Sequence, residues 1–210
     1  LLWKASNKII ESSNINKFSK KVENKFNINF KKNFNSLWNW SLKNNEVFWS
    51  ELWDFSDIKG DKGKRILDKN KIFYKNIFFP DAKLNFAENL IPLTSKEIAV
   101  FSLKENGTED FITWEELFSN VCKFSDYLIK TNIKKGDVVA AYVPNTIETI
   151  VAFLGSTKNG CIWSSCSPDF GPQGVIERFK QIEPKVLITC DHYYYNGKKI
   201  NILNNVEIIT

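Results

Sequence analysis

The sequence contains no methionine and only one histidine, His192. Because Leu1 stands where a start methionine would be, we expect the natural beginning of the protein to be missing from the sequence. Cysteine is also scarce, and four residues do not suggest a scaffold built on disulfides. The glycine patterns GxGxxG and GxxxxGK[ST] are both absent. A nucleotide-binding oxidoreductase, which stays open as an alternative, therefore lacks its fingerprint.

Arginine is nearly absent, since Arg65 and Arg178 are the only arginines among 29 basic residues. Lysine, asparagine, isoleucine and phenylalanine are over-used, as an AT-rich genome imposes on any protein, so the net charge of +5 does not indicate nucleic-acid binding. Arginine is the preferred reader of phosphates and base edges. No basic stripe interleaved with aromatic residues occurs either. We expect no nucleic-acid partner.

Long hydrophobic runs are missing as well. No apolar segment approaches the roughly 20 residues that a membrane-spanning helix needs. The first ten residues, LLWKASNKII, lack the basic and then apolar pattern of a signal peptide. These absences predict a protein without a membrane span, and we expect it in the cytoplasm.

Large aromatic side chains are abundant in the first part of the chain. Residues 6–25 predict one or two surface helices, with Ser6 as the N-cap. Between Phe34 and Phe55, aromatic residues recur at the i, i+3, i+4 spacing of buried helix faces. This spacing favours packing on a neighbouring domain over a ligand groove. The residues expected to make that contact are Trp38, Trp49 and Trp53.

From residue 98 onward the pattern alternates between strands and helices. The apolar run VVAAYV (138–143) has no polar face and predicts a strand buried on both sides. Alternation at this spacing is typical of an α/β fold with a mainly parallel, doubly wound sheet. The ending NVEIIT (205–210) predicts the beginning of another strand, so we expect the sheet to be incomplete. The predicted strands of this one sheet are 98–103, 138–143, 161–165 and 186–189, and the predicted helices are 85–90, 114–130, 146–158 and 172–183. A return strand at 111–114 predicts a hairpin with 98–103. Thr113 to Glu116 predict a capping box at the start of helix 114–130, and Asn145 or Thr146 is the predicted cap of helix 146–158.

Ligands of open parallel sheets bind beyond the carboxyl ends of the strands. Three loops qualify, 144–146, 166–174 and 190–198. In the second loop, Gly171–Gly174 could offer backbone N–H groups to an anion, but Pro172 favours an ordinary helix start. The cysteine and histidine spacings do not form a zinc knuckle, and we expect no metal site. A nucleophilic pair of Cys166 and His192 would need a group that orients the imidazole, and the sequence shows none.

Several segments resemble the acetoacetyl-CoA synthetases (acetoacetate–CoA ligases) of the adenylate-forming superfamily, close to acetyl-CoA synthetase. Residues 37–41 (LWNWS), 48–49 (FW) and 53–55 (WDF) resemble the amino-terminal cap of that family. Residues 79–90 (FPDAKLNFAENL) resemble the motif before its large domain. Residues 162–171 (IWSSCSPDFG) and 193–198 (YYYNGK) resemble the acetoacetate branch in particular.

This resemblance implies a helical cap over residues 1–95 and the first part of the AMP-binding domain over residues 96–210. It implies a ligase of lipid metabolism that uses ATP and Mg²⁺ to activate acetoacetate, or a similar short acid, as an acyl-adenylate and then transfers the acyl group to CoA. The small-molecule partners would be ATP, CoA and acetoacetate. Another short-chain acyl-CoA synthetase, for acetate or propionate, is the alternative, and a stand-alone nucleotide-binding or interaction module is a further one.

The resemblance also assigns a CoA site. Ser167, Pro168 and Asp169 correspond to the region near the CoA adenine, and Lys198 corresponds to a basic residue near the 3′-phosphate. Tyr195 stands where acetyl-CoA synthetases carry an arginine. The phosphate loop, the ribose-binding aspartate and the catalytic lysine of the family are expected beyond Thr210. We therefore assign no catalytic residue in this chain and expect the chain alone to be inactive.

Overall fold

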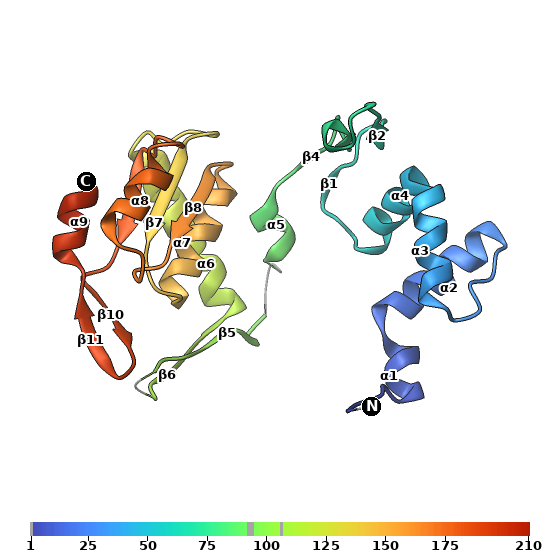
Figure 1. Cartoon of the computed structure of the whole chain (residues 1–210), viewed down its shortest axis with the longest axis horizontal. Helices are drawn as coiled ribbons and strands as arrows, with labels where there is room; N and C mark the ends of the chain where they lie inside the picture. The colour runs from blue at the N-terminus through green and yellow to red at the C-terminus, as the bar shows by residue number, and fades with distance from the viewer. Residues whose placement is uncertain (1, 92–94, 106) are drawn as a thin grey trace. The chain divides into compact units, whose positions relative to one another are not determined.

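The computed structural model describes residues 2–91, 95–105 and 107–210. They form two compact units, Leu1–Leu84 and Asn85–Thr210 (Figure 1). No helix among the described residues is long and apolar enough to cross a membrane.

The first unit is built on four helices, as the aromatic spacing predicts. Ser6 is the first N-cap, since its hydroxyl accepts a hydrogen bond from the Ile9 amide at 3.3 Å. The core of the unit gathers Phe18 and Val22 of α2 and Leu37 of α3, with Leu52 of α4 packed against them. The helices are α1 (Asn7–Ser12), α2 (Asn14–Phe26), α3 (Phe34–Lys43) and α4 (Asn45–Phe55).

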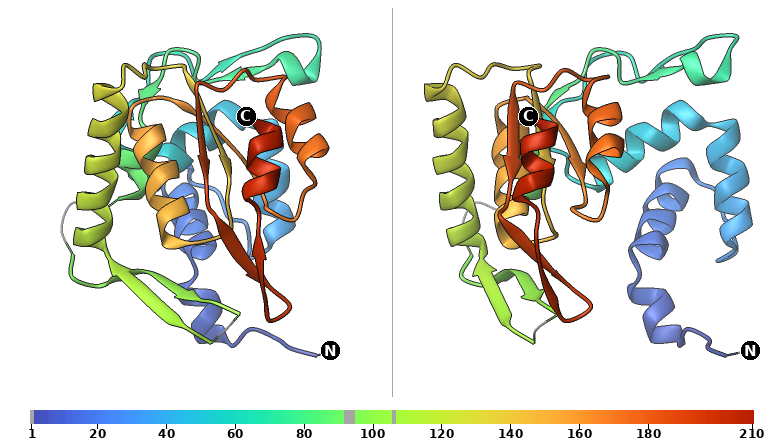
Figure 2. Two further views of the ribbon diagram at one scale, coloured as in Figure 1. Left: turned by 90° about the vertical axis from the view of Figure 1, so that its left-hand side faces the viewer. Right: turned by 60° about the vertical axis from the view of Figure 1, so that its left-hand side comes forward.

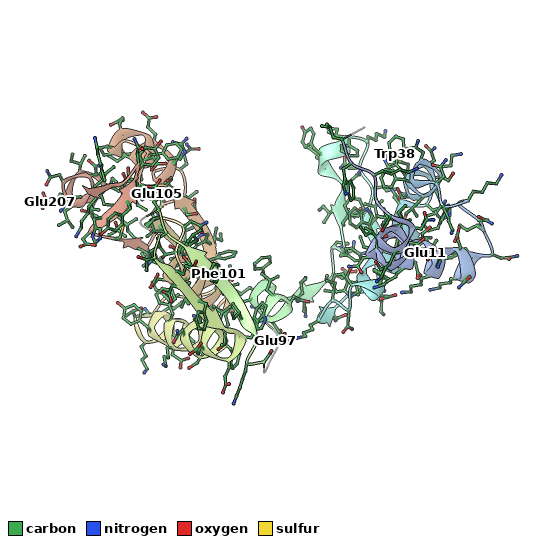
Figure 3. All side chains as sticks on the ribbon, turned by 90° about the horizontal axis from the view of Figure 1, so that it is seen from below. Glu11, Trp38, Glu97, Phe101, Glu105 and Glu207 are labelled. Carbon is green, nitrogen blue, oxygen red and sulfur yellow. The ribbon has the colours of Figure 1, made fainter. Side chains whose placement is uncertain are left out.

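The rest of the first unit is extended and carries short strand pairs. Trp49 and Trp53 of α4 pack on this segment, with ring centroids 5.4 Å from Phe78 and 4.9 Å from Phe79. Trp38, which is labelled in Figure 3, is 51% exposed, and packing of the tryptophans on a neighbouring domain stays a prediction. The segment contains β1 (Gly60–Asp61) paired with β4 (Lys83–Leu84), β2 (Leu67–Asp68) paired with β3 (Ile77–Phe78), and the 3₁₀ turn η1 (Phe73–Lys75).

A parallel sheet forms the centre of the second unit. Its strands are β7 (Val138–Tyr142), β8 (Ile162–Cys166) and β9 (Val186–Thr189), in the order β8-β7-β9. Val139 to Tyr142 in the central strand have no exposed surface, which confirms the predicted burial on both faces.

Helices cover both faces of this sheet (Figure 2). On one face Val139 and Trp163 meet α6 (Trp114–Lys130) and α7 (Ile147–Lys158) through Leu128 and Phe153. On the other face, Ala140 and Tyr142 pack with α8 (Pro172–Phe179) and α9 (Leu203–Ile209). The α/β, doubly wound fold class is confirmed.

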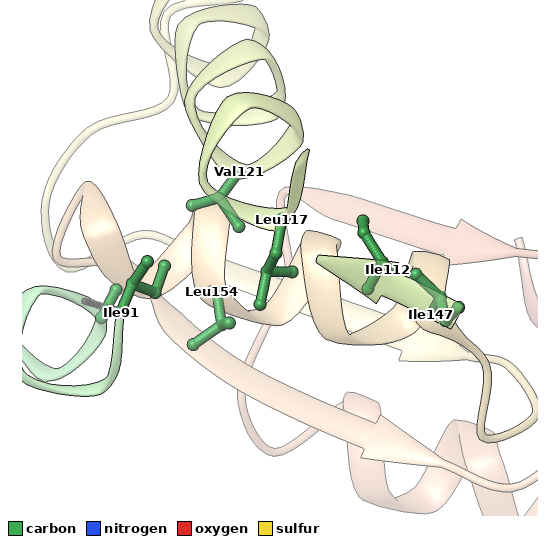
Figure 4. Packing of buried hydrophobic residues seen from close by; sticks show 7 residues of the cluster. Ile91, Ile112, Leu117, Val121, Ile147 and Leu154 are labelled. Carbon is green, nitrogen blue, oxygen red and sulfur yellow. The ribbon is translucent and has the colours of Figure 1, made fainter. Parts of the chain in front are cut away.

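The two longest helices of the second unit, α6 and α7, begin at capping residues that the sequence predicts. Thr113 and Glu116 form the predicted capping box of α6, with the Thr113 amide 3.0 Å from a Glu116 carboxylate oxygen. Thr146, rather than Asn145, caps α7. Between them lies an apolar cluster that also includes the short helix α5 (Phe86–Leu90); Figure 4 shows Leu117 and Val121 of α6 meeting Leu154 of α7.

One predicted strand does not belong to the parallel sheet. β5 (Ile98–Leu103) pairs antiparallel with β6 (Glu109–Thr113), and in the described ranges it joins no other strand. The predicted hairpin is thus confirmed, but the assignment of 98–103 to the parallel sheet was wrong. Phe101 is 55% exposed while Val100 packs on the α6–α7 cluster, so only one face of β5 is buried.

The carboxyl-terminal segments also differ from the prediction. NVEIIT is part of α9 and not a strand, because Ile202, Val206 and Ile209 recur at helical spacing and pack on the sheet. The helix after Gly171 ends at Phe179 and not at 183, since Glu183 precedes Pro184 and has a φ of 46°. The predicted loop 190–198 contains most of a hairpin, β10 (His192–Tyr195) and β11 (Lys198–Asn201).

Candidate functional site

The three loops singled out by the sequence follow the carboxyl ends of β7, β8 and β9. A pocket of about 610 Å³ lies between the loop after β7 and the segment after β9. Pro144–Thr146 line one wall, Thr189–Tyr194 another, and Leu103–Glu105 from the β5–β6 hairpin a third. None of the five predicted CoA-binding residues lines this pocket, and they lie on the neighbouring loop and hairpin.

The backbone of the loop after β8 is fixed by hydrogen bonds, while part of the loop is exposed to solvent. The Phe170 amide donates to the Ser167 carbonyl at 3.1 Å and closes a turn. Pro168 is buried, Ser167 is half-buried and Asp169 is exposed. The hydroxyl of Tyr142, the last residue of β7, lies 2.8 Å from the Pro168 carbonyl oxygen and 2.7 Å from that of Phe170. The backbone of the loop is thus fixed while the Asp169 carboxylate faces solvent.

Asp169 connects this loop to the β10–β11 hairpin. Its carboxylate interacts with the hydroxyl of Tyr193, and burial together with this negative charge raises the pKa of Tyr193. The structure therefore brings the first predicted group, Ser167–Asp169, against the base of the hairpin that carries the second group, Tyr195 and Lys198.

Tyr195 and Lys198 lie directly opposite each other at the hairpin tip. Between them, Asn196 and Gly197 have φ values of 49° and 70°, the left-handed pair that a two-residue type I′ turn requires. Because side chains alternate along a strand, Tyr193 and Tyr195 share one face, and Lys198 shares it with them. Lys198 is exposed to solvent, about 7 Å further along the hairpin than Tyr193.

The hairpin tip is also tied to the β5–β6 hairpin. The Gly197 amide donates to a Glu105 carboxylate oxygen at 3.3 Å. The tips of the two hairpins approach each other in Figure 2, and Glu105 is labelled in Figure 3. Sequence reasoning missed this hairpin, although Asn196-Gly197 between apolar and aromatic residues is the usual signal for one.

The structure does not support a nucleophilic pair of Cys166 and His192, because the thiol is buried. Cys166 is buried among Val175 and Phe179, and burial raises the pKa of the Cys166 thiol, which keeps it protonated. The imidazole does have a neighbour that the sequence did not reveal, since His192 Nδ1 lies 2.8 Å from Asp191 Oδ1. This contact lowers the pKa of Asp191.

Neither a metal site nor an anion site is built at these loops. Within residues 2–91, 95–105 and 107–210, no three His, Cys, Asp or Glu side chains lie close enough to hold a metal ion. Cys161 precedes β8 rather than lying within it. Gly171 is the N-cap of α8 with Pro172 in the first turn, which is an ordinary helix start.

Comparison with known proteins covers the whole chain. A family model described as AMP-binding enzyme matches residues 93–208. The acetoacetyl-coenzyme A synthetase of Rhizobium meliloti (strain 1021) is 37% identical over 208 residues, which is 99% of this chain and 32% of that protein. The acetoacetyl-CoA synthetase of Xenopus tropicalis is 40% identical over 172 residues, 80% of this chain and 25% of that protein.

Two further matches are a relative named for a different acid and a solved structure. The malonamoyl-CoA synthetase of Penicillium aethiopicum is 33% identical over 219 residues, 100% of this chain and 30% of that protein. The solved acetoacetyl-CoA synthetase from Streptomyces lividans is 29% identical, with a TM-score of 0.92 over 99% of this chain and 33% of that one. The chain thus spans about a third, or less, of the length of these relatives.

Proposed function

The chain belongs to the AMP-binding enzyme family, and on this premise we propose that it forms the amino-terminal part of an ATP-dependent acid–thiol ligase. In the first step a carboxylate attacks the α-phosphate of ATP, giving an acyl-adenylate and pyrophosphate. In the second step the thiol of CoA attacks the acyl carbon and releases AMP. The observation that carries this proposal is the likeness, over nearly the whole chain, to a solved acetoacetyl-CoA synthetase.

The acid we propose is acetoacetate or a close analogue. Acetoacetate and malonamate, the acids named by the relatives, share a carbonyl group two carbons from the carboxylate. A short 3-oxo acid is therefore the substrate class, and acetate or propionate, which lack that carbonyl, are the alternatives. In the full-length protein, kcat/KM for acetoacetate should exceed that for butyrate, its analogue without the oxo group, at least about tenfold. Equal values for the two acids would contradict the proposed substrate class.

The exposed face of the loop and hairpin is our proposed CoA site. Ser167, Pro168 and Asp169 would lie near the adenine, where the carboxylate of Asp169 can accept a hydrogen bond from an amino group. Lys198 would meet the 3′-phosphate as a point charge, without the two-pronged geometry that an arginine offers. Tyr195, opposite Lys198, offers an aromatic ring to the same ligand.

We also propose that the full-length enzyme uses Mg²⁺ and that it is located in the cytoplasm. Mg²⁺ would accompany ATP, and because the described residues offer no group of carboxylates for it, we assign its ligands to other parts of the full-length enzyme. The four cysteines are all free thiols, as is usual in the reducing cytoplasm, which is the location we propose.

A further inference from the structure

Tyr142 carries a polar hydroxyl group in the most deeply buried strand of the parallel sheet. It ends the central strand β7, and its side chain is completely buried. A phenol hydroxyl without a partner is costly in such a place, so a buried tyrosine keeps its position only where its oxygen is hydrogen-bonded. The partners of this hydroxyl therefore indicate what the residue does.

All of these partners belong to the loop after β8 or to α9. The hydroxyl proton is shared between the Pro168 carbonyl at 2.8 Å and the Phe170 carbonyl at 2.7 Å. The side-chain amide of Asn205 approaches the hydroxyl oxygen at 3.5 Å and can donate to it. The two carbonyls lie on either side of Asp169, so one side chain fixes the peptide groups that aim the Asp169 carboxylate outward.

Other contacts hold the same loop at its edges. The guanidinium carbon of Arg178 lies 4.5 Å from the centre of the Phe170 ring, and the Asp169 carboxylate interacts with Tyr193. These contacts act on exposed side chains, whereas Tyr142 acts on the buried backbone. Tyr142 thus connects the backbone of the loop to the buried central strand of the sheet.

We propose that Tyr142 is a positioning residue for CoA, which sets the backbone of Ser167–Gly171 before the ligand arrives. The inference rests on the proposed function, because that function makes the loop a CoA-binding element. A loop ordered in advance loses less conformational entropy on binding, so the benefit should appear as affinity for CoA and not in the chemistry of adenylation.

The first test measures the loop itself, in the 210-residue chain and without any ligand. Tyr142→Phe removes the hydroxyl and keeps the ring, and Tyr127→Phe is the matched control at a 58% exposed site on α6. Hydrogen exchange of the Phe170 amide, which is protected by its bond to Ser167, should become about tenfold faster in Tyr142→Phe only. The amides of Val139 to Ala141 should exchange at the wild-type rate in both variants, which shows that the sheet is intact.

The second test measures CoA use in the full-length enzyme. Tyr142→Phe should raise the KM for CoA about three- to tenfold and leave acetoacetate-dependent ATP–pyrophosphate exchange within about twofold of wild type.

Each outcome decides a separate question. Unchanged Phe170 exchange would overturn the positioning role. Faster exchange with an unchanged KM for CoA would retain that role and contradict the assignment of the loop to CoA. A loss of ATP–pyrophosphate exchange as large as the loss of CoA affinity would show that Tyr142 supports the fold as a whole, which would also overturn the proposal.

Discussion

Single side chains at the tip of the β10–β11 hairpin differ in which face they occupy. Lys198 and Lys199 are consecutive, exposed and equally charged, but they pair with Tyr195 and Tyr194 and so project from opposite faces. The face of Lys198 is also the face of Tyr193, which contacts Asp169. A ligand that lies along this face should therefore distinguish two neighbouring lysines.

Lys198→Glu tests this distinction. It replaces an attraction to one exposed phosphate by a repulsion, and screening by solvent and salt should limit the effect to roughly ten- to thirtyfold in the KM for CoA. Lys199→Glu, the matched control, should change this KM less than about threefold. Steady-state kinetics and ATP–pyrophosphate exchange in the full-length enzyme measure both effects. If exchange fell as far as CoA affinity did, Lys198 would act on ATP or on the fold and not on CoA.

Asp137 is a second residue with a well-defined role, in the turn before β7. One carboxylate oxygen accepts from the Lys134 amide at 2.8 Å, and the other lies 2.7 Å from Lys185 Nζ. The contact with Lys185, followed by the bond from Lys134, holds the pKa of Asp137 below its usual value of 3.8. Since the pKa is lower in the folded state, the stabilisation is present above the unfolded pKa and is lost as the pH falls through the folded pKa.

Asp137→Asn should therefore lower the melting temperature by a few degrees at pH 7. The difference from wild type should shrink as the pH falls below about 4, where the native carboxylate takes up its proton. Thermal unfolding of the 210-residue chain between pH 3 and pH 7 measures this, with Asp126→Asn on the exposed side of α6 as the control. A difference that stays constant over this range would show that charge is not the cause.

At the scale of elements, α6 and α7 are in close contact at Gly155. A Cβ atom on Gly155 would lie 2.8 Å from Phe124 Cδ1 and 3.1 Å from the Val121 carbonyl oxygen. Gly174 in α8 offers the opposite case, because a Cβ there would meet only the Arg178 guanidinium, at 3.4 Å. The same substitution should thus have opposite effects in the two helices.

Gly155→Ala should lower the free energy of unfolding by about 1–3 kcal/mol, since overpacking outweighs the higher helix propensity of alanine. Gly174→Ala should leave that free energy unchanged or raise it by up to about 1 kcal/mol. Urea unfolding of the 210-residue chain compares the two variants. Stabilisation by both substitutions would mean that α6 and α7 are not in close contact at Gly155.

Elements whose signals are local were predictable from the sequence. The capping box at Thr113 gave the start of α6, and the apolar run of β7 gave its burial. The partners of a strand are not local, which is why β5 was placed in the wrong sheet. Val206 and Ile209 look like a strand in the six letters NVEIIT, and only together with Ile202 do they show the spacing of α9.

The candidate site was only partly predictable, for a related reason. The resemblance selected Ser167–Asp169, Tyr195 and Lys198, but their common face depends on the register of a hairpin that was overlooked. The role of Tyr142 could not be predicted at all. Within the apolar segment VVAAYV, Tyr142 is expected only to pack in the core. Its hydrogen-bond partners lie 26 residues or more away in sequence.

At the scale of the whole molecule, the chain consists of two units with separate cores. Phe18, Val22 and Leu37 belong to the first, and the clusters around the parallel sheet belong to the second. The predicted family boundary after residue 95 lies in the second unit, which begins at Asn85, and it stays a prediction. The relatives are about three times as long, so most of a ligase of this kind would lie outside these 210 residues.

The 210-residue chain alone should neither exchange pyrophosphate into ATP nor form an acyl-CoA. The expected reason is that the residues that bind the triphosphate and catalyse the transfer belong to the rest of the enzyme. Pyrophosphate release with ATP, Mg²⁺ and acetoacetate measures this, with the full-length enzyme as the positive control. Release from the pure 210-residue chain that depends on acetoacetate would refute the prediction.

The central place of β7 has a consequence for how the protein is made. Both of its neighbours, β8 and β9, come later in the chain, so a ribosome delivers this deeply buried strand before either partner exists. β7 ends at Tyr142 and β9 begins at Val186, and at about 5–20 residues per second the nascent strand waits about 2–9 s for its second neighbour. During that interval at least one edge of β7 is open to other chains. The same burial that makes β7 the most protected strand of the finished sheet makes it the most vulnerable segment during synthesis.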